Sequence, residues 1–594
     1  MTSLIKRLSF LLLGILTPVL LSSQSSGLQS PDDFLPYRHG ERFSPHHLLV
    51  DYFEHVAANS NRLTLRAYGF TSEGRPLIYG IVSTPANLER IEQIRENHLR
   101  KTGLLEGATD DSDLAIVWLS YGVHGNEAAA SESAIATVYE LTRTDRSDVQ
   151  KWLENTIVII DPCLNPDGYS RYTHWNIGAS NTITNPNPAS REHNEPWPGG
   201  RVNHYLFDLN RDWAWQTQLE TRQRIKAYQQ WMPHVHVDFH EMGYNDPYYF
   251  APAAQPYHNY ITEWQGVFQQ DVGRNNAKYF DEKGWTYFTR EIFDLLYPSY
   301  GDTYPIFNGA IGMTYEQGGH SRAGKAILLE NGDTLRLIDR INHHVVTGLS
   351  TIEVSAQNAT ELNKNFLDYF KKSKSSPEGP YKSYVIKNSN DPAKIKALCD
   401  LLDRNQIRYG RLGNAKNSLT GFDYQTRASG SLNVGGDDLV ISAYQPMSVL
   451  VQVLFDPDVD LVDSLTYDIT AWALPYAYGL EAYALKTRLN PDQAYRFSTT
   501  SEWSPRKTKD YAYLAKWSSL NSVRFLSALH QQGIRVRCAS ADFVLEGKPY
   551  NKGTLVITRA DNKKLDDRLG ERIATIAKDI GQEVTAKPVL TAVT

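Results

Sequence analysis

Two residues that could share a metal ion stand three positions apart in His124-Gly125-Asn126-Glu127. This stretch follows an apolar run, 114–120, that we expect to be a strand, and it opens a helix-like run over 127–143. Side chains at positions i and i+3 lie on one face of a helical turn, so the imidazole and the carboxylate can reach the same ion. Because a hydrolytic zinc site usually takes three protein ligands and leaves one position open for water, a third ligand is expected elsewhere.

The best candidate for that third ligand is His240. It ends an expected strand, 234–240, just before a glycine-containing loop. Ligands of α/β sheets bind beyond the C-terminal ends of the strands, which favours this position. His236 and Asp238 share its face of the strand, and either could support the ligand through a hydrogen bond. The competing candidate, His174, lies in a long loop with no strand to hold it.

A third expected strand, 310–315, ends in Glu316 and is followed by Gly318-Gly319. Metal-assisted hydrolysis of a peptide needs a general base that takes a proton from water and later gives it to the leaving amine. A carboxylate at a strand end before a glycine turn suits that task. By itself the position is weak evidence, since a glutamate at a strand end is usually only solvated.

These residues need a sheet that brings the strand ends together. Strand-like and helix-like runs alternate up to about residue 353, which is typical of an α/β domain. The almost wholly apolar strand expected at 156–161 is of the kind that is buried on both faces. We therefore predict a mixed central sheet with helices on both faces. Between 168 and 205 the regular pattern disappears, and a loop of that length in a compact domain is usually functional.

A polar stretch with proline and glycine follows residue 354 and predicts a domain boundary. Beyond it the alternation resumes in a different register. We expect a first domain over 26–355, a linker over 356–380, and a second, accessory α/β domain over 381–594. The last of these shows no nucleophile motif and no phosphate loop, and its role is not predicted.

The N-terminus has the pattern of a secretory signal peptide. Lys6 and Arg7 precede an apolar run, 8–21, and small polar residues follow. We predict a signal peptide over 1–25, export to the periplasm or the extracellular space, and no stable membrane insertion after cleavage. An uncleaved N-terminal anchor is the alternative.

Charge and cysteine content narrow the remaining classes of function. The net charge is −6 and no basic patch stands out, which argues against nucleic acid as a partner. Three cysteines, Cys163, Cys399 and Cys538, are too few for a disulfide framework and too scattered for a thiolate metal site. Cys399 could pair with Cys538, and buried free thiols explain the sequence equally well.

Taken in order, the motifs of this chain resemble the zinc carboxypeptidases of the M14 (carboxypeptidase A) family. The motifs are Ser72-Glu73-Gly74-Arg75-Pro76, His124-Gly125-Asn126-Glu127, Asn165-Pro166-Asp167-Gly168, Asp208-Leu209-Asn210-Arg211, His240 and Thr314-Tyr315-Glu316. The segment 197–201 is also similar to a subgroup of larger exported bacterial proteins with this domain. HxxE alone is a weak signal, whereas the ordered set is specific.

The resemblance implies one Zn²⁺ ion held by His124, Glu127 and His240, with Glu316 as general base and acid. The resemblance also implies that residues 26–355 adopt the mixed-sheet fold of the zinc carboxypeptidases. Such a zinc site with two histidines and a glutamate is a standard example for carboxypeptidase A, so this ligand set follows from the resemblance.

For the substrate, the resemblance implies that Asn210 and Arg211 hold its C-terminal carboxylate, because a guanidinium grips a carboxylate through two hydrogen bonds. An ordinary salt bridge of Arg211 is the alternative. The second arginine of the family, which polarises the scissile carbonyl, has no counterpart at the usual distance. Arg171 is the nearest candidate, and the segment 165–168 is expected to be a structural turn.

The mobile tyrosine of the family corresponds to Tyr297, with Tyr300 and Tyr304 as competitors. The loop that follows is short, so the residue that sets side-chain preference cannot be aligned. Asp302 could favour a basic C-terminal residue or could be structural.

The resulting prediction is a zinc-dependent carboxypeptidase acting on peptides or proteins with a free C-terminal carboxylate. One alternative is an amidase or deacylase of the same fold, acting on N-acyl amino acids or peptidoglycan stem peptides. Another is a non-catalytic binding protein.

Overall fold

The computed structural model describes residues 27–110, 112–459, 472–497, 510–565 and 568–588. The predicted signal peptide, 1–25, lies outside these residues. Among the residues that the structure describes, no helix combines the length and the apolar character needed to cross a bilayer.

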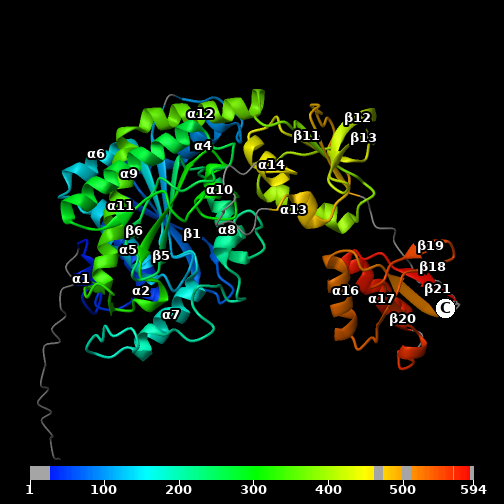
Figure 1. The fold of residues 1–594 in the computed structure, drawn as a ribbon, viewed down its shortest axis with the longest axis horizontal. Coiled ribbons are helices and arrows are strands. Elements are labelled where there is room, and N and C mark those ends of the chain that lie inside the picture. Colours follow the sequence, from blue (N-terminus) through cyan, green and yellow to red (C-terminus); the bar gives the residue numbers. More distant parts are fainter. Residues whose placement is uncertain (1–26, 111, 460–471, 498–509, 566–567, 589–594) are drawn as a thin grey trace, which may run out of the picture.

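An eight-stranded mixed sheet forms the centre of the N-terminal region, residues 27–375 (Figure 1). Its strand order is β1-β2-β4-β3-β5-β8-β6-β7. The strands are β1 (Leu63–Phe70), β2 (Pro76–Val82), β3 (Ala115–Tyr121), β4 (Thr156–Asp161), β5 (Val235–Met242), β6 (Tyr248–Tyr249), β7 (Tyr287–Phe288) and β8 (Ile311–Gly318). The four strands β4, β3, β5 and β8 are parallel neighbours. Antiparallel pairs are β1 with β2, β2 with β4, and β6 with β8, while β6 and β7 are parallel. The C-terminal ends of the parallel strands therefore meet at one edge.

Helices cover both faces of this sheet, which confirms the predicted fold class. Alternate residues of β3 point to opposite sides, as the two-residue period of a strand requires. Val117 and Leu119 join a core formed with α2 (His46–Asn59), α5 (Ala128–Thr142), α9 (Glu263–Lys283) and α11 (Leu337–Gln357). Ile116 and Trp118 join a second core with α4 (Ile91–Thr102) and α8 (Leu219–Gln229).

The stretch predicted as a linker, 356–380, contains the helix α12 (Ala359–Ser375). This helix packs against α4 and β3, and it contributes Phe366 and Phe370 to a buried core. The apolar face of α12 explains why the segment is ordered, although its sequence is largely charged on the other face. The proposed division into domains at this point stays a prediction.

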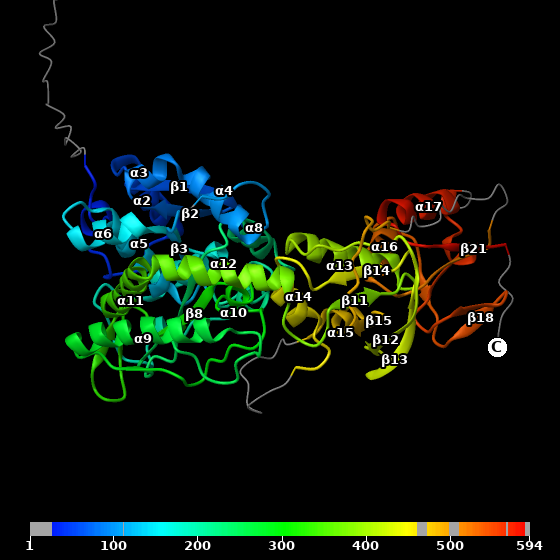
Figure 2. The same cartoon turned by 90° about the horizontal axis from the view of Figure 1, so that it is seen from above.

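Beyond α12 the described residues form two larger sheets and a two-stranded one, β18 (Phe543–Leu545) with β19 (Lys548–Tyr550), each antiparallel in its described pairings. A five-stranded sheet has the order β13-β12-β15-β11-β14, and a four-stranded sheet has the order β17-β20-β16-β21. Their strands are β11 (Ser383–Ile386), β12 (Lys416–Asp423), β13 (Ala428–Val434), β14 (Leu439–Ser442), β15 (Ala482–Leu485), β16 (Ala512–Ala515), β17 (Arg537–Cys538), β20 (Leu555–Thr558) and β21 (Thr585–Lys587). Figure 2 shows the five-stranded sheet between the N-terminal region and the four-stranded sheet.

The two C-terminal sheets differ in their packing. The five-stranded sheet shares a core with the N-terminal region, because Tyr384 and Leu398 cluster with Trp213 and Tyr304. The four-stranded sheet has a core of its own, built with α16 (Leu520–Gln531) and α17 (Arg568–Ile580). The three cysteines are free thiols: Cys163 and Cys399 are buried and Cys538 is exposed, so of the two readings left open by the sequence, the free thiols are found and the Cys399–Cys538 disulfide is not.

Candidate metal centre

Four of the predicted site residues lie at one edge of the central sheet. His124 follows β3, and His240 lies in β5 in register with Glu316 of the neighbouring strand β8. Glu127 is the residue that caps the N-terminus of α5. The turn 124–127 packs directly against the start of α7 (Pro166–Ala179): a Cβ atom at Gly125 would clash with the backbone nitrogen of Tyr169, so the turn needs glycine there.

The donor atoms of His124, Glu127 and His240 face one another. Nδ1 of His124 is 2.8 Å from Oε1 of Glu127, and Nδ1 of His240 is 2.9 Å from Oε2 of the same carboxylate. The two Nδ1 atoms are 3.2 Å apart. These separations are close to the ~3.3 Å edge of a tetrahedron with bonds of ~2.0–2.1 Å to Zn²⁺. All three side chains are buried, so the donor set fits a zinc ion with three protein ligands.

Each of the two histidines is held by a carboxylate on its other nitrogen. Nε2 of His124 is 3.0 Å from Oδ1 of Asp208, and Nε2 of His240 is 2.9 Å from Oδ2 of Asp238. Such a partner fixes the ring orientation and leaves Nδ1 available as a donor to a metal. Asp238 was one of two predicted supports. Asp208 was missed, although it opens the Asp208–Arg211 motif.

Electrostatics distinguish the buried carboxylates of this edge. Burial by itself would raise the pKa of Glu127, but His124 and His240 outweigh it and hold that pKa well below its usual range. Burial raises the pKa of Glu316 to about 8, opposed in part by His240. Oε2 of Glu316 is buried and has no hydrogen-bond partner among the described residues. A carboxylate in this state is ready to accept a proton.

Asn210 and Arg211 lie in a short 3₁₀ turn, Leu209–Arg211, next to His240. The side-chain oxygen of Asn210 accepts hydrogen bonds from the Gly301 backbone and the Trp213 indole, and its nitrogen is 3.2 Å from Nε2 of His240. The guanidinium of Arg211 lies 4.5 Å from the centre of the Tyr300 ring.

The predicted oxyanion donor, Arg171, does not lie in the site cavity. Its guanidinium donates to the backbone carbonyls of Gly199, Val202 and Asn203, and it holds the long loop in place. That loop carries Arg201 into the cavity instead, with Nη1 3.4 Å from Oε1 of Glu127. Arg201 therefore lines the cavity and Arg171 does not. The segment 197–201 was noted in the sequence, but the path of an irregular loop cannot be read from local pattern.

The three candidate tyrosines also lie in different surroundings. Tyr297 is buried in a core, and its hydroxyl donates to the backbone carbonyl of Trp472. Tyr304 is also buried, with its hydroxyl bonded to Asn405. Tyr300, named only as a competitor, is the tyrosine that lines the cavity.

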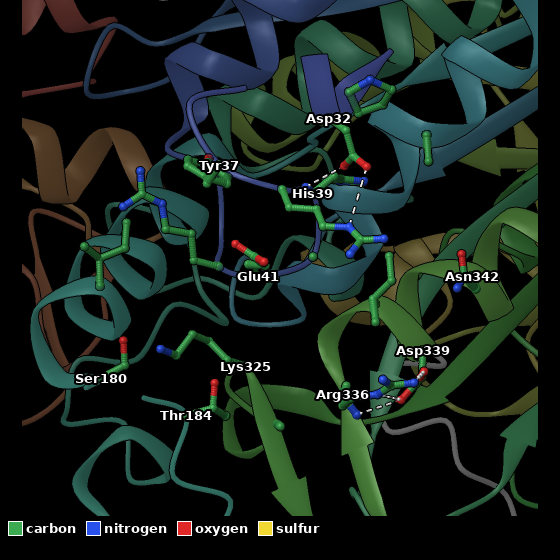
Figure 3. Close-up of a pocket in the computed structure, with 18 of the residues that line it drawn as sticks. Asp32, Tyr37, His39, Glu41, Ser180, Thr184, Lys325, Arg336, Asp339 and Asn342 are labelled. Carbon is green, nitrogen blue, oxygen red and sulfur yellow. Dashed lines mark hydrogen bonds and ion pairs between the residues drawn. The ribbon is translucent and has the colours of Figure 1, made fainter. Parts of the chain in front are cut away.

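The cavity at this edge has a volume of about 280 Å³ and contains Glu316, Asp302 and His320 besides the metal donors. A larger cavity, of about 1390 Å³, lies at the N-terminal segment and is shown in Figure 3. Two ion pairs lie in its wall, Asp32 with Arg38 and Arg336 with Asp339. The cluster of metal donors found among the described residues belongs to the smaller cavity, which is therefore the candidate active site.

Comparison with known proteins supports this choice. Residues 49–239 match the family model described as zinc carboxypeptidase, a stretch that includes His124, Glu127, Asn210 and Arg211 and ends one residue before His240. Carboxypeptidase 2 of Trichophyton equinum is 26% identical over 198 residues, covering 32% of this chain and 27% of the relative. Probable carboxypeptidase 2 of Arthroderma benhamiae is 29% identical over 132 residues, covering 21% of this chain and 18% of the relative. The chain thus spans about a quarter or less of the length of these curated relatives.

Solved structures of carboxypeptidases are also similar. A metallo-carboxypeptidase from Burkholderia cenocepacia aligns with a TM-score of 0.36 and 15% identity, covering 53% of this chain and 68% of that protein. Carboxypeptidase A from Helicoverpa armigera aligns with a TM-score of 0.35 and 16% identity, covering 55% and 75%. Residues 49–239 of this chain are thus similar to the M14 family of zinc carboxypeptidases.

Proposed function

We propose that this protein is an exported, zinc-dependent carboxypeptidase that removes residues from the C-terminus of peptides or proteins. The observation that carries the proposal is the set of three buried donor side chains, whose facing atoms are 2.8–3.2 Å apart, beside the carboxylate of Glu316 on the neighbouring strand. The match to the zinc carboxypeptidase family supports the same reading.

His124, Glu127 and His240 would hold one zinc ion, with Asp208 and Asp238 orienting the two imidazoles. Zinc in such a site lowers the pKa of a coordinated water molecule to about 7 and polarises a carbonyl oxygen.

Glu316 serves as the general base and acid. It takes a proton from the water that attacks the scissile carbonyl carbon, and it returns that proton to the nitrogen of the leaving amine as the C–N bond breaks. Its burial supports this role, because a carboxylate shielded from solvent has a pKa closer to the working pH than a solvated one.

Arg201 stabilises the negative charge that develops on the carbonyl oxygen. Its guanidinium already lies within 3.4 Å of Glu127 in the cavity, and Asp208 holds it through Nη2 at 2.9 Å. A donor fixed in this way needs little rearrangement when the charge appears, which is the basis of oxyanion stabilisation.

Arg211 binds the C-terminal carboxylate of the substrate, and Asn210 positions the surrounding turn. The ring of Tyr300 covers the guanidinium of Arg211 in this structure. A substrate carboxylate reaches Arg211 when that ring moves aside, which makes Tyr300 the tyrosine that responds to substrate.

The test compares one peptide with a free C-terminus and the same peptide with a C-terminal amide, with and without a zinc chelator. We expect release of the C-terminal amino acid from the free peptide alone, loss of this activity with chelator, and recovery when Zn²⁺ is added. Equal hydrolysis of both peptides, or activity that resists the chelator, contradicts the proposal.

Two further substrates decide between the alternatives. Cleavage of N-acyl amino acids or muropeptides without cleavage of peptides would favour the amidase or deacylase. Ligand binding without any hydrolysis would favour a binding protein.

A further inference from the structure

His320 has an unusual backbone conformation next to the candidate active site. It is the first residue of a short 3₁₀ turn, His320–Arg322, that follows β8, and its φ is +52°. A residue other than glycine rarely adopts this left-handed region, and it persists there only where the surrounding structure holds it. The conformation turns the imidazole toward the cavity that contains Glu127 and Glu316.

A buried ion pair holds this turn. Nη1 of Arg340 is 2.6 Å from Oε2 of Glu241, both side chains are fully buried, and Arg340 also donates to the Gly324 carbonyl. Gly319 lies against this pair, and a Cβ atom there would clash with the Glu241 carboxylate. Glu241 in turn accepts from the Ala129 backbone of α5. The backbone before and after His320 is thus fixed to the elements that carry the metal donors.

The ring of His320 is also oriented. Nδ1 is 2.9 Å from the hydroxyl oxygen of Ser321. When that hydroxyl donates to Nδ1, the neutral imidazole carries its proton on Nε2. Nε2 lies 3.9 Å from Oε1 of Glu127, on the cavity side, and about a third of the side chain is exposed.

Two donors from separate loops therefore converge on one place. Nη1 of Arg201 is 3.4 Å from Oε1 of Glu127, and Nε2 of His320 is 3.9 Å from the same atom. His320 is not part of the described group of donor atoms that lie within 4.8 Å of one another, so it stands beside the metal donors and not among them. His320, Arg201 and the metal donors line one cavity, of about 280 Å³.

His193, in the neighbouring loop, shows what a structural histidine of this region looks like. Its Nδ1 is 2.6 Å from the Arg322 carbonyl and its Nε2 is 2.8 Å from the Asn185 carbonyl, and it is fully buried. Both nitrogens are used by the backbone. His320 instead presents one nitrogen to a cavity.

We propose that His320 is a catalytic hydrogen-bond donor whose Nε2–H, together with Arg201, binds the oxygen of the scissile carbonyl as that oxygen becomes negatively charged. His320 keeps its proton throughout, and the proton transfers belong to Glu316. This inference rests on the proposed hydrolysis at the same site. The turn after β8 would then help to bind the tetrahedral species that forms when water attacks the scissile carbonyl.

The test uses His320→Gly and His320→Asn, because glycine and asparagine both tolerate a positive φ and should keep the turn. We expect His320→Gly to keep one equivalent of zinc and a KM within a few-fold of the wild type. Its kcat should fall by about 10²-fold, the usual loss when one oxyanion donor is removed. The kcat of His320→Asn should lie between that of the wild type and that of His320→Gly. Imidazole added at millimolar concentration should restore part of the His320→Gly rate, which a purely structural role would not allow.

Ligand binding gives a second readout that does not depend on turnover. Calorimetry with a phosphinate peptide, which mimics the tetrahedral species, should show affinity reduced by about the same factor as kcat. The affinity for a non-cleavable ground-state peptide should stay unchanged. His204→Gly is the matched control, since His204 is half-exposed and pairs with Glu73 outside the cavity.

The outcomes separate this inference from the function on which it rests. A wild-type protein without chelator-sensitive hydrolysis overturns the proposed function and this inference together. An active wild type with an equally active His320→Gly variant, equal phosphinate affinity and no response to imidazole overturns the role of His320 alone. Loss of zinc from His320→Gly also overturns it, because His320 would then be a metal ligand.

Discussion

His236 and His240 lie four residues apart on the same face of β5, and both are buried, yet their surroundings differ. His236 lies in the interior of the sheet, where Nε2 meets the Ser120 hydroxyl at 2.9 Å and the ring packs edge-on against Trp213. Burial lowers its pKa to about 4. At the strand end, His240 lies 2.9 Å from both Asp238 and Glu127. Burial alone would lower its pKa as well, but these two carboxylates hold it well above the usual range.

The difference between these two histidines shows which end of a parallel strand can carry a metal ligand. Inside the sheet a histidine is surrounded by neighbouring strands and helices, so it is kept neutral and acts in packing. At the C-terminal edge, loops bring Glu127 and Asp208 to the same place from other parts of the chain. Burial together with nearby carboxylates, and not burial alone, makes a candidate metal ligand.

Replacing His240 with alanine should have the largest effect, and it tests whether His240, unlike His236, binds the metal. One of three proposed metal donors disappears, so we expect loss of bound zinc and a fall of more than ~10⁴-fold in kcat/KM, beyond the ~10²–10⁴-fold attributable to one proton-transfer group. Metal analysis and peptide hydrolysis measure both effects. His236→Asn is the matched control and should retain zinc. A His240→Ala protein with a full equivalent of zinc would contradict the assignment.

Glu316→Gln separates proton transfer from metal binding. The amide cannot accept the proton from water, so kcat should fall by about 10²–10⁴-fold while zinc content stays at that of the wild type. Hydrolysis rates and metal analysis give the two numbers. Glu291→Gln, on an exposed residue of the same region, serves as control. Near-normal turnover in Glu316→Gln would require another base.

Asp238→Asn examines the support behind His240. The carboxylate that accepts from Nε2 loses its charge, so zinc affinity should fall by about 10–100-fold without loss of the fold. Competition with a chelator of known affinity measures the change. Asp208→Asn should give a similar loss through His124. Unchanged affinity in both variants would show that these carboxylates do not act through the ligands.

His236 should affect stability and not catalysis. Its pKa is near 6.5 in the unfolded chain and about 4 in the folded protein, so between these values the unfolded state binds the extra proton. Its contribution to stability is present above pH 6.5 and is lost as the pH falls toward 4, with a slope of up to ~1.4 kcal/mol per pH unit. Unfolding by denaturant at several pH values should show a shallower decline for His236→Asn. An unchanged slope would mean that His236 does not take part.

Much of the site could be predicted because it depends on short-range pattern. An apolar strand followed by His124 and Glu127, and strands that end at His240 and Glu316, are visible in the sequence. Parallel strands place their ends at one edge, so these four residues were expected to meet. The resemblance of the ordered motifs to a known family added the ligand set and the substrate contacts.

The remaining parts depended on long-range packing. Whether Arg171 or Arg201 lines the cavity depends on the path of an irregular loop. Tyr300 lines the cavity, whereas Tyr297 and Tyr304 are buried in a core shared with the five-stranded sheet. The antiparallel pairing of both C-terminal sheets was also not foreseen, because strand direction depends on which segments meet and not on the local pattern of each. The sequence by itself determined which residues end the strands, since periodicity and turns are local. Only the tertiary structure decided which side chains from the loops complete the site, since loop paths are set by contacts between residues far apart in the chain.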